Sequence, residues 1–130
     1  MLILTIRTDK PVAEIGLYDG QKQISYETWE AHRQLAETIH LKVKQVLSDN
    51  KMTRHQLEGI AVYRGPGSFT GLRIGITVAN ALADGSEIPI AGYEGEDWLA
   101  ESIKKLTDGV NDNVVMPEYG ALPNITAPRK

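Results

Sequence analysis

The amino-acid sequence predicts a single α/β domain in which a mixed five-stranded sheet lies between helices on both faces. Three observations support this fold class. The chain opens with short apolar runs of strand length, two of which flank the strong hairpin signal Asp19-Gly20. Apolar residues then recur at helical spacing in three longer segments, and each later apolar run lies between two of them. This order predicts antiparallel strands first and parallel strands afterwards.

The first three strands are expected within residues 2–29. Leu2 to Ile6 is an almost continuous apolar run, which is typical of a central strand buried on both faces. Val12 to Tyr18 predicts a second strand, and Gln21 to Trp29 alternates well enough to form a third. Together these segments predict an antiparallel meander.

The remaining elements alternate between helix and strand. A first helix is expected from Glu30 to Ser48, because the apolar residues of this segment share one face. Thr53-Arg54-His55-Gln56 matches a capping box and predicts one extra helical turn. The later elements are a strand over Gly59–Tyr63, a helix over 69–84 that ends at Asp84-Gly85, a strand over Ile88–Ala91 and a helix over Glu94–Leu106. This order is typical of ribonuclease H-like and actin-like ATPase domains.

The composition indicates an ordinary globular protein. Hydrophobic residues make up 42% and charged residues 24%, and no apolar run approaches the roughly 20 residues that span a bilayer. A soluble, cytoplasmic protein without membrane association is therefore expected. The absence of cysteine excludes a thiolate zinc site and a cysteine nucleophile, and the net charge of −3 gives no general attraction to nucleic acid.

The pattern changes after residue 106. Residues 1–106 are expected to form the domain, 107–113 a linker and 114–130 a tail that Pro117, Pro123 and Pro128 keep from forming a regular helix. Because the tail also contains apolar residues such as Val115, Tyr119 and Ile125, it is expected to lie on the domain.

A glycine-rich turn, Gly65-Pro66-Gly67-Ser68-Phe69-Thr70-Gly71, connects the fourth strand to the second long helix. Such a turn can present backbone N–H groups to a phosphate. However, no lysine follows Gly71, and the three glycines do not have the spacing of a dinucleotide fingerprint. A phosphate- or nucleotide-binding domain that uses residues 65–71 remains the alternative function, and a tight turn that permits close helix packing is favoured.

Small residues recur every fourth position in the following helix, at Gly71, Gly75, Ala79 and Ala83. They form one nearly flat stripe, which predicts that another segment packs closely against it. The pattern leaves open whether that segment belongs to this chain or to a partner.

The candidate polar residues do not form a recognisable catalytic set. A two-metal nuclease would need carboxylates at the ends of the first and fourth strands, where Arg7 and Arg64 stand instead. Arg7, Arg64 and Arg73 are candidate anion-binding residues, and the simpler interpretation of Arg7 and Arg64 is that they are solvated or ion-paired residues at strand ends. The three histidines show no metal-ligand spacing, and Ser68 does not lie in a nucleophile elbow. No catalytic residue, metal or cofactor is expected.

The stretch from Gly65 through Gly75, with Ala79 and Ile88-Pro89-Ile90, resembles the signature of the TsaB (YeaZ) family. The resemblance covers roughly residues 1–105, and Pro117-Glu118-Tyr119 is similar to the family's C-terminal segment. It implies an actin-like ATPase fold and a role in threonylcarbamoyladenosine synthesis next to the tRNA anticodon. Two departures stand out. Arg7-Thr8-Asp9 replaces an Asp-Thr-Ser-like triplet, and the family's second actin-like domain has no counterpart here, as in a truncated form.

The resemblance further implies a non-catalytic subunit that binds a TsaD-like catalytic subunit through helices 31–48 and 69–84. A TsaE-like ATPase would join the assembly, tRNA would be contacted indirectly, and a homodimer could use the same surface. The candidate interface residues are Leu35, Ile39, Val43, Gly71, Leu72, Gly75, Val78, Ala79 and Leu82.

Overall fold

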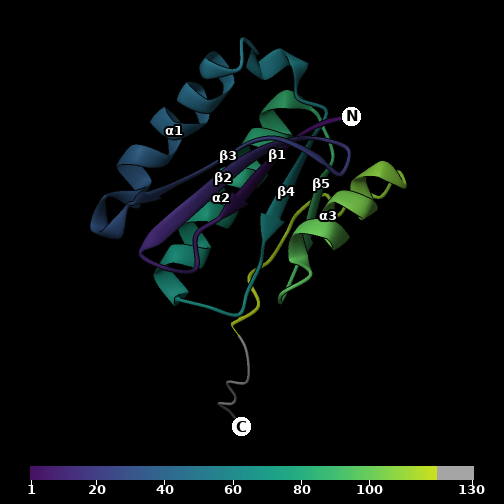
Figure 1. The fold of residues 1–130 in the computed structure, drawn as a ribbon. Coiled ribbons are helices and arrows are strands. Elements are labelled where there is room, and N and C mark those ends of the chain that lie inside the picture. Colours follow the sequence, from purple (N-terminus) through teal and green to yellow (C-terminus); the bar gives the residue numbers. More distant parts are fainter. Residues whose placement is uncertain (120–130) are drawn as a thin grey trace, which may run out of the picture.

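The computed structural model describes residues 1–119 and contains one five-stranded sheet in the order β3-β2-β1-β4-β5 (Figure 1). The strands are β1 Leu2–Arg7, β2 Val12–Asp19, β3 Lys22–Glu30, β4 Gly59–Tyr63 and β5 Ile90–Tyr93. The helices are α1 Leu35–Asp49, α2 Phe69–Ser86 and α3 Trp98–Thr107, with short 3-10 turns at His32–Gln34 and Arg54–Gln56. In this part of the chain, no helix combines the length and apolarity that a membrane span needs.

The predicted mixed sheet of five strands, antiparallel at first and parallel afterwards, is confirmed. β1 pairs antiparallel with β2 and parallel with β4, and β4 pairs parallel with β5. β1 is the central strand, and Ile3, Leu4 and Ile6 are completely buried because both of its faces are covered. The capping box of Thr53 and Gln56 is also confirmed.

The core consists of two layers, one on each face of the sheet. α1 and α2 cover one face, where Leu4 and Ile6 pack against residues such as Ile39 and Leu72. α3 covers the other face over β1, β4 and β5, where Ile3 packs with Ile103 and Leu106 (Figure 1). The helices therefore lie on both faces of the sheet, as predicted.

Three predicted boundaries are wrong, each for a local reason. α1 begins at Leu35 instead of Glu30, because Glu30 still pairs with β2 and His32 has a φ of 46°. α2 continues past Gly85 to Ser86, and Glu87, which has a left-handed φ of 56°, caps it by donating its N–H to the carbonyls of Ala83 and Asp84. β5 starts two residues late because the Ile88 N–H caps α2 by donating to the Ala83 carbonyl at 3.0 Å.

The start of α3 also differs from the prediction. The helix begins at Trp98, because Gly95 has a φ of 82° and donates its N–H to the Gly65 carbonyl at 3.0 Å. A residue in this conformation cannot continue a right-handed helix. Residues 94–97 therefore form a turn that ties β5 to the glycine-rich turn.

The segment predicted as a linker is hydrogen-bonded along the edge of β5. The Asp112 N–H donates to the Ile90 carbonyl at 2.8 Å, and its carboxylate accepts from the Gly92 N–H at 2.9 Å and from Lys105 at 2.7 Å. Asn111 accepts from the Ile90 N–H at 3.1 Å. These bonds satisfy backbone groups that an edge strand would otherwise expose. Asn111 and Asp112, in the segment predicted as a linker, are therefore bonded to the domain.

The described part of the tail packs on the domain. Val115 is 3% exposed, and its N–H and carbonyl both bond the side chain of Asn80 in α2 at 2.9 and 3.0 Å. The ring of Tyr119 stacks on that of Phe69 at 4.6 Å between centroids. Pro123, Ile125 and Pro128 lie outside the described residues.

Candidate functional site

The glycine-rich turn is packed by the chain itself. Gly65 has a φ of 133°, and a side chain there would overlap the backbone of Glu118, whose N–H donates to the Arg64 carbonyl at 2.6 Å. A side chain at Gly67 would overlap the side chain of Asp9. The Tyr63 hydroxyl donates to the Pro66 carbonyl at 2.6 Å. The tail and the loop after β1 therefore occupy the space around the turn.

The small-residue stripe of α2 faces the loop between β1 and β2. The Thr8 hydroxyl donates to the Gly71 carbonyl at 2.7 Å, and a methyl group at Gly71 or Gly75 would overlap Thr8. Ala79 and Ala83 are 0% and 3% exposed. The close neighbour that the stripe predicts is therefore a segment of this chain.

The candidate interface residues fall into two groups. Five of them, Leu35, Ile39, Leu72, Gly75 and Ala79, lie in the chain's own core and expose almost no surface. Gly71 is half-buried against Thr8. Val43 and Val78 are also buried, at 5% and 8% exposure, and together with the half-buried Leu82 they line hollows between α1 and α2. The prediction that the core residues form a partner surface needs correction, because packing within the domain has already covered them.

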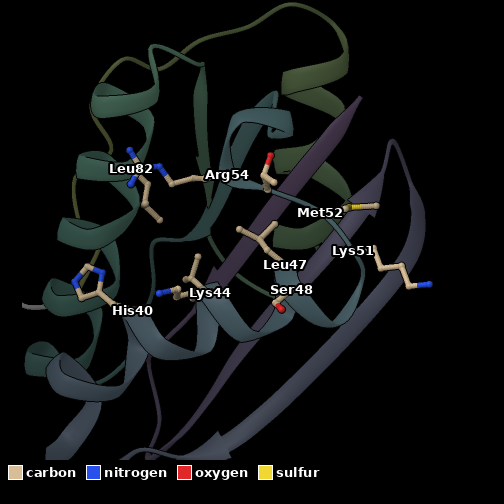
Figure 2. A pocket seen from close by; sticks show the side chains of 10 residues that line it. His40, Lys44, Leu47, Ser48, Lys51, Met52, Arg54 and Leu82 are labelled. Carbon is tan, nitrogen blue, oxygen red and sulfur yellow. The ribbon is translucent and has the colours of Figure 1, made fainter.

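The outer side of α1 and α2 carries two hollows that share His40, and we call them together the α1–α2 groove. The larger has a volume of about 600 Å³ and lies at the C-terminal end of α1 (Figure 2). Its apolar floor consists of Val43, Leu47, Met52 and Leu82. The polar residues that line it are His40, Lys44, Ser48, Lys51, Thr53 and Arg54.

The smaller hollow lies at the N-terminal ends of the two helices and has a volume of about 350 Å³. It is lined by Ala36, His40, Thr70, Arg73, Ile74, Thr77 and Val78. Ala36, Arg73 and Thr77 are exposed, whereas Ile74 is half-buried. An apolar depression bordered by exposed polar side chains has the composition of a protein-binding surface.

The candidate anion-binding arginines are each held by a protein group. Arg7 bonds the Asp9 carboxylate at 2.7 and 3.1 Å and lies over the Tyr63 ring, and its bond to Asp9 raises the pKa of Arg7 above its ordinary value. Arg64 donates to the Met116 carbonyl at 2.9 Å and lies 3.5 Å from Glu94. Arg73 lies over the ring of Phe69. The simpler interpretation of strand-end pairing is supported for Arg7 and Arg64.

Several residues of the groove were missed as candidates from the sequence. Ala36, His40, Lys44 and Leu47 follow one another at intervals of three or four residues and therefore lie along one side of α1, and Lys51 follows just past the end of the helix. That spacing is visible in the sequence. Its meaning is not, because it depends on which side of α1 faces α2.

Comparison with known proteins identifies relatives of this chain. A family model described as "TsaD: tRNA N6-adenosine threonylcarbamoyltransferase" matches residues 29–121. The tRNA threonylcarbamoyladenosine biosynthesis protein TsaB of Escherichia coli is 36% identical over 93 residues, which are 71% of this chain and 39% of that protein. The chain spans less than half of the length of the curated TsaB relatives it matches.

Two solved structures share the fold. YeaZ from Pseudomonas aeruginosa superposes with a TM-score of 0.66 at 25% identity, covering 72% of this chain and 43% of that one. RuvC from Thermus thermophilus superposes with a TM-score of 0.52 at 13% identity, covering 92% and 86%. At that identity the likeness to RuvC concerns the fold alone. The predicted ribonuclease H-like or actin-like ATPase class is confirmed.

Proposed function

We propose a function from one premise: this chain belongs to the TsaD family and, within it, is TsaB-like. We infer that it acts in threonylcarbamoyladenosine modification of tRNA as a non-catalytic subunit. In this role it binds and activates a TsaD-like catalytic subunit through the α1–α2 groove. The activity of the longer relatives comes to this chain only as part of this proposal.

The observation that carries the proposal is the contrast between a filled turn and an open groove. The glycine-rich turn has the chain's own backbone against Gly65 and Gly71 and the side chain of Asp9 against Gly67. The groove has an apolar floor, and exposed side chains of α1 and α2 line it. A buried turn supports a structural role, and an open apolar groove between two helices is suited to a partner's helix.

The arrangement at the end of β1 supports a non-catalytic role. Arg7 stands where a nucleotide-binding member of this fold would need a metal-binding carboxylate, and Asp9 is engaged by the Arg7 guanidinium at 2.7 Å. A guanidinium repels a divalent cation, so this end of the sheet is a poor site for a metal-bound nucleotide.

A homologous partner suits the groove, because paired helices of related domains can pack as a four-helix arrangement. Such an interface buries about 1,600 Å² in a stable complex, and both hollows would lie within it. A TsaE-like ATPase would then join the pair, and tRNA would meet the assembled complex. We place this assembly in the cytoplasm.

The experiment that tests the proposal fills the smaller hollow without changing charge. Thr77 is exposed and lines that hollow, so Thr77→Trp should leave the fold intact and block the approach of a partner helix. Binding to the TsaD-like subunit of the same organism should weaken at least about tenfold in calorimetry, which corresponds to about 1.4 kcal/mol. Thr107→Trp is the matched control, because Thr107 is exposed at the end of α3 on the other face of the sheet.

Equal affinity of Thr77→Trp, Thr107→Trp and the unaltered chain would refute the groove as the binding site. Calorimetric heat from ATP, ADP or threonylcarbamoyl-adenylate with the chain alone would instead favour the nucleotide-binding alternative.

A further inference from the structure

We propose that the α1–α2 groove selects a partner with acidic side chains and disfavours a second copy of this chain. This inference rests on the proposed function, because it specifies the chemistry of the partner that the groove binds. It is carried by the charges around the groove.

Within residues 1–119, the ionisable side chains that line the two hollows all belong to basic residues. Lys44, Lys51 and Arg54 line the larger hollow, Arg73 lines the smaller one, and His40 lines both. Among the residues that the structure describes, no aspartate or glutamate lines either hollow. Figure 2 shows Lys44 and Arg54 extending toward the side of Leu82 on α2, whereas Lys51 points away from it.

These cations are not neutralised within the part of the chain that the structure describes. Elsewhere in residues 1–119 basic side chains form ion pairs, as in Lys104–Asp108 at 2.8 Å and Lys105–Asp112 at 2.7 Å. Over the same residues Lys44, Arg54 and Arg73 form no ion pair. We call these unpaired basic side chains the basic rim of the groove. An apolar floor with a basic rim is complementary to a helix that carries apolar and acidic residues.

A second copy would meet this rim with the same charges. In a two-fold symmetric dimer the same patch faces itself, so Lys44 and Arg54 of one copy approach the basic rim of the other. Closing the apolar floor would also remove water that screens these charges. The acidic residues Glu37 and Asp84 lie on the same helices but line neither hollow. Self-pairing through the groove is therefore disfavoured relative to pairing with an acidic partner.

The test reverses the two cations that extend toward α2. Lys44 and Arg54 are both exposed, so Lys44→Glu/Arg54→Glu should fold normally. Affinity for the TsaD-like subunit should fall at least about tenfold. Affinity of the unaltered chain should decrease as salt rises from about 50 to 300 mM. The double variant Lys22→Glu/Lys104→Glu is the control: Lys22 begins β3 and Lys104 lies in α3, and it makes the same change in net charge away from the groove.

Self-association provides an independent readout by sedimentation velocity. The unaltered chain and Lys44→Glu/Arg54→Glu should each sediment as a monomer, whereas their mixture should form a dimer because opposite rims then face each other. Partner affinity unchanged by the reversal, or a homodimer of the unaltered chain that Thr77→Trp dissociates, would overturn the inference.

These outcomes separate the inference from the proposed function. If Thr77→Trp abolishes partner binding and the reversal does not weaken it, the groove is the binding site and the charge argument is wrong. If the TsaD-like subunit binds none of the chains, the proposed function fails. The mixture of unaltered and charge-reversed chains then still decides the charge argument.

Discussion

The two sides of α2 differ in what covers them. Its inner stripe, which includes Gly71 and Gly75, packs so closely on Thr8 that no methyl group would fit. Its outer side, which includes Arg73 and Thr77, is exposed and borders the groove. The inner side is small and regular in sequence, whereas the outer side is mixed. On α2, the stronger sequence pattern therefore marks the contact within the chain, and the weaker one marks the open surface.

The physical reason is the difference in packing tolerance. A backbone that approaches a helix within van der Waals contact permits only glycine or alanine at the contact positions. A partner surface that is open in the free chain accepts many side chains, so it leaves no comparable pattern. Substitutions on the two sides of α2 should therefore change the free energy of unfolding by amounts that differ in sign and size.

The largest effect is expected for Gly71→Ala. The added methyl group would overlap the Thr8 carbonyl, which belongs to the backbone and cannot move without shifting the loop. Overpacking should exceed the gain in helix propensity, so we expect the free energy of unfolding to fall by about 2 kcal/mol. Urea denaturation monitored by circular dichroism measures this. An unchanged urea midpoint would show that the inner side of α2 tolerates a Cβ, and the inner and outer sides would then not differ in packing tolerance.

Asn80→Ala should have the next largest effect. Asn80 holds Val115 through two hydrogen bonds, and its removal leaves the Val115 N–H and carbonyl without this partner. We expect a loss of about 1.5 kcal/mol and faster amide exchange at Val115. Amides of β1 serve as the internal reference. Unaltered exchange at Val115 would contradict the conclusion that α2 holds the tail.

Thr8→Val should cost about 1 kcal/mol, because it removes the hydroxyl that donates to the Gly71 carbonyl and keeps the shape of the side chain. The same denaturation experiment measures the change. Combining it with Gly71→Ala should give a non-additive loss, since both act on one contact. Strict additivity would mean that the two substitutions act at separate places.

The smallest effect, of opposite sign, is expected for Gly85→Ala. Gly85 is helical and exposed, and a methyl group there would have nothing within 4 Å. Replacing glycine in a helix should raise the free energy of unfolding by about 0.7 kcal/mol. This variant is the matched control for Gly71→Ala on the same helix. If Gly71→Ala and Gly85→Ala were both destabilising, glycine-to-alanine substitutions in α2 would not distinguish its inner side from its outer side.

Much of the fold could be predicted from local patterns. Leu2 to Ile6 predicted the buried central strand, Asp19-Gly20 the hairpin, and Gly59–Tyr63 matched β4 at both ends. These elements depend on residues that are close in sequence. The starts of β5 and α3 were misplaced, because Ile88 caps α2 and Gly95 bonds Gly65, and neither contact is visible in a sequence window.

The candidate site was predicted only at the level of its elements. The sequence indicated the two helices that form the groove, and Val43, Val78 and Leu82 line it. It also identified Gly71 and Gly75 as positions of close contact, but not the other partner in that contact. For the residues that line the groove, a role in binding a second protein stays a prediction.

By itself, the sequence determined that this chain builds a mixed sheet and that one helix must pack closely on something, because periodicity and glycine placement are local properties. Only the tertiary structure decided that the close neighbour is Thr8, which is 63 positions away from Gly71. It also decided that Lys44 and Arg54 border one groove with Leu82. Contacts of this kind depend on how β1, α1 and α2 are stacked, since burial of the apolar faces fixes which sides remain open.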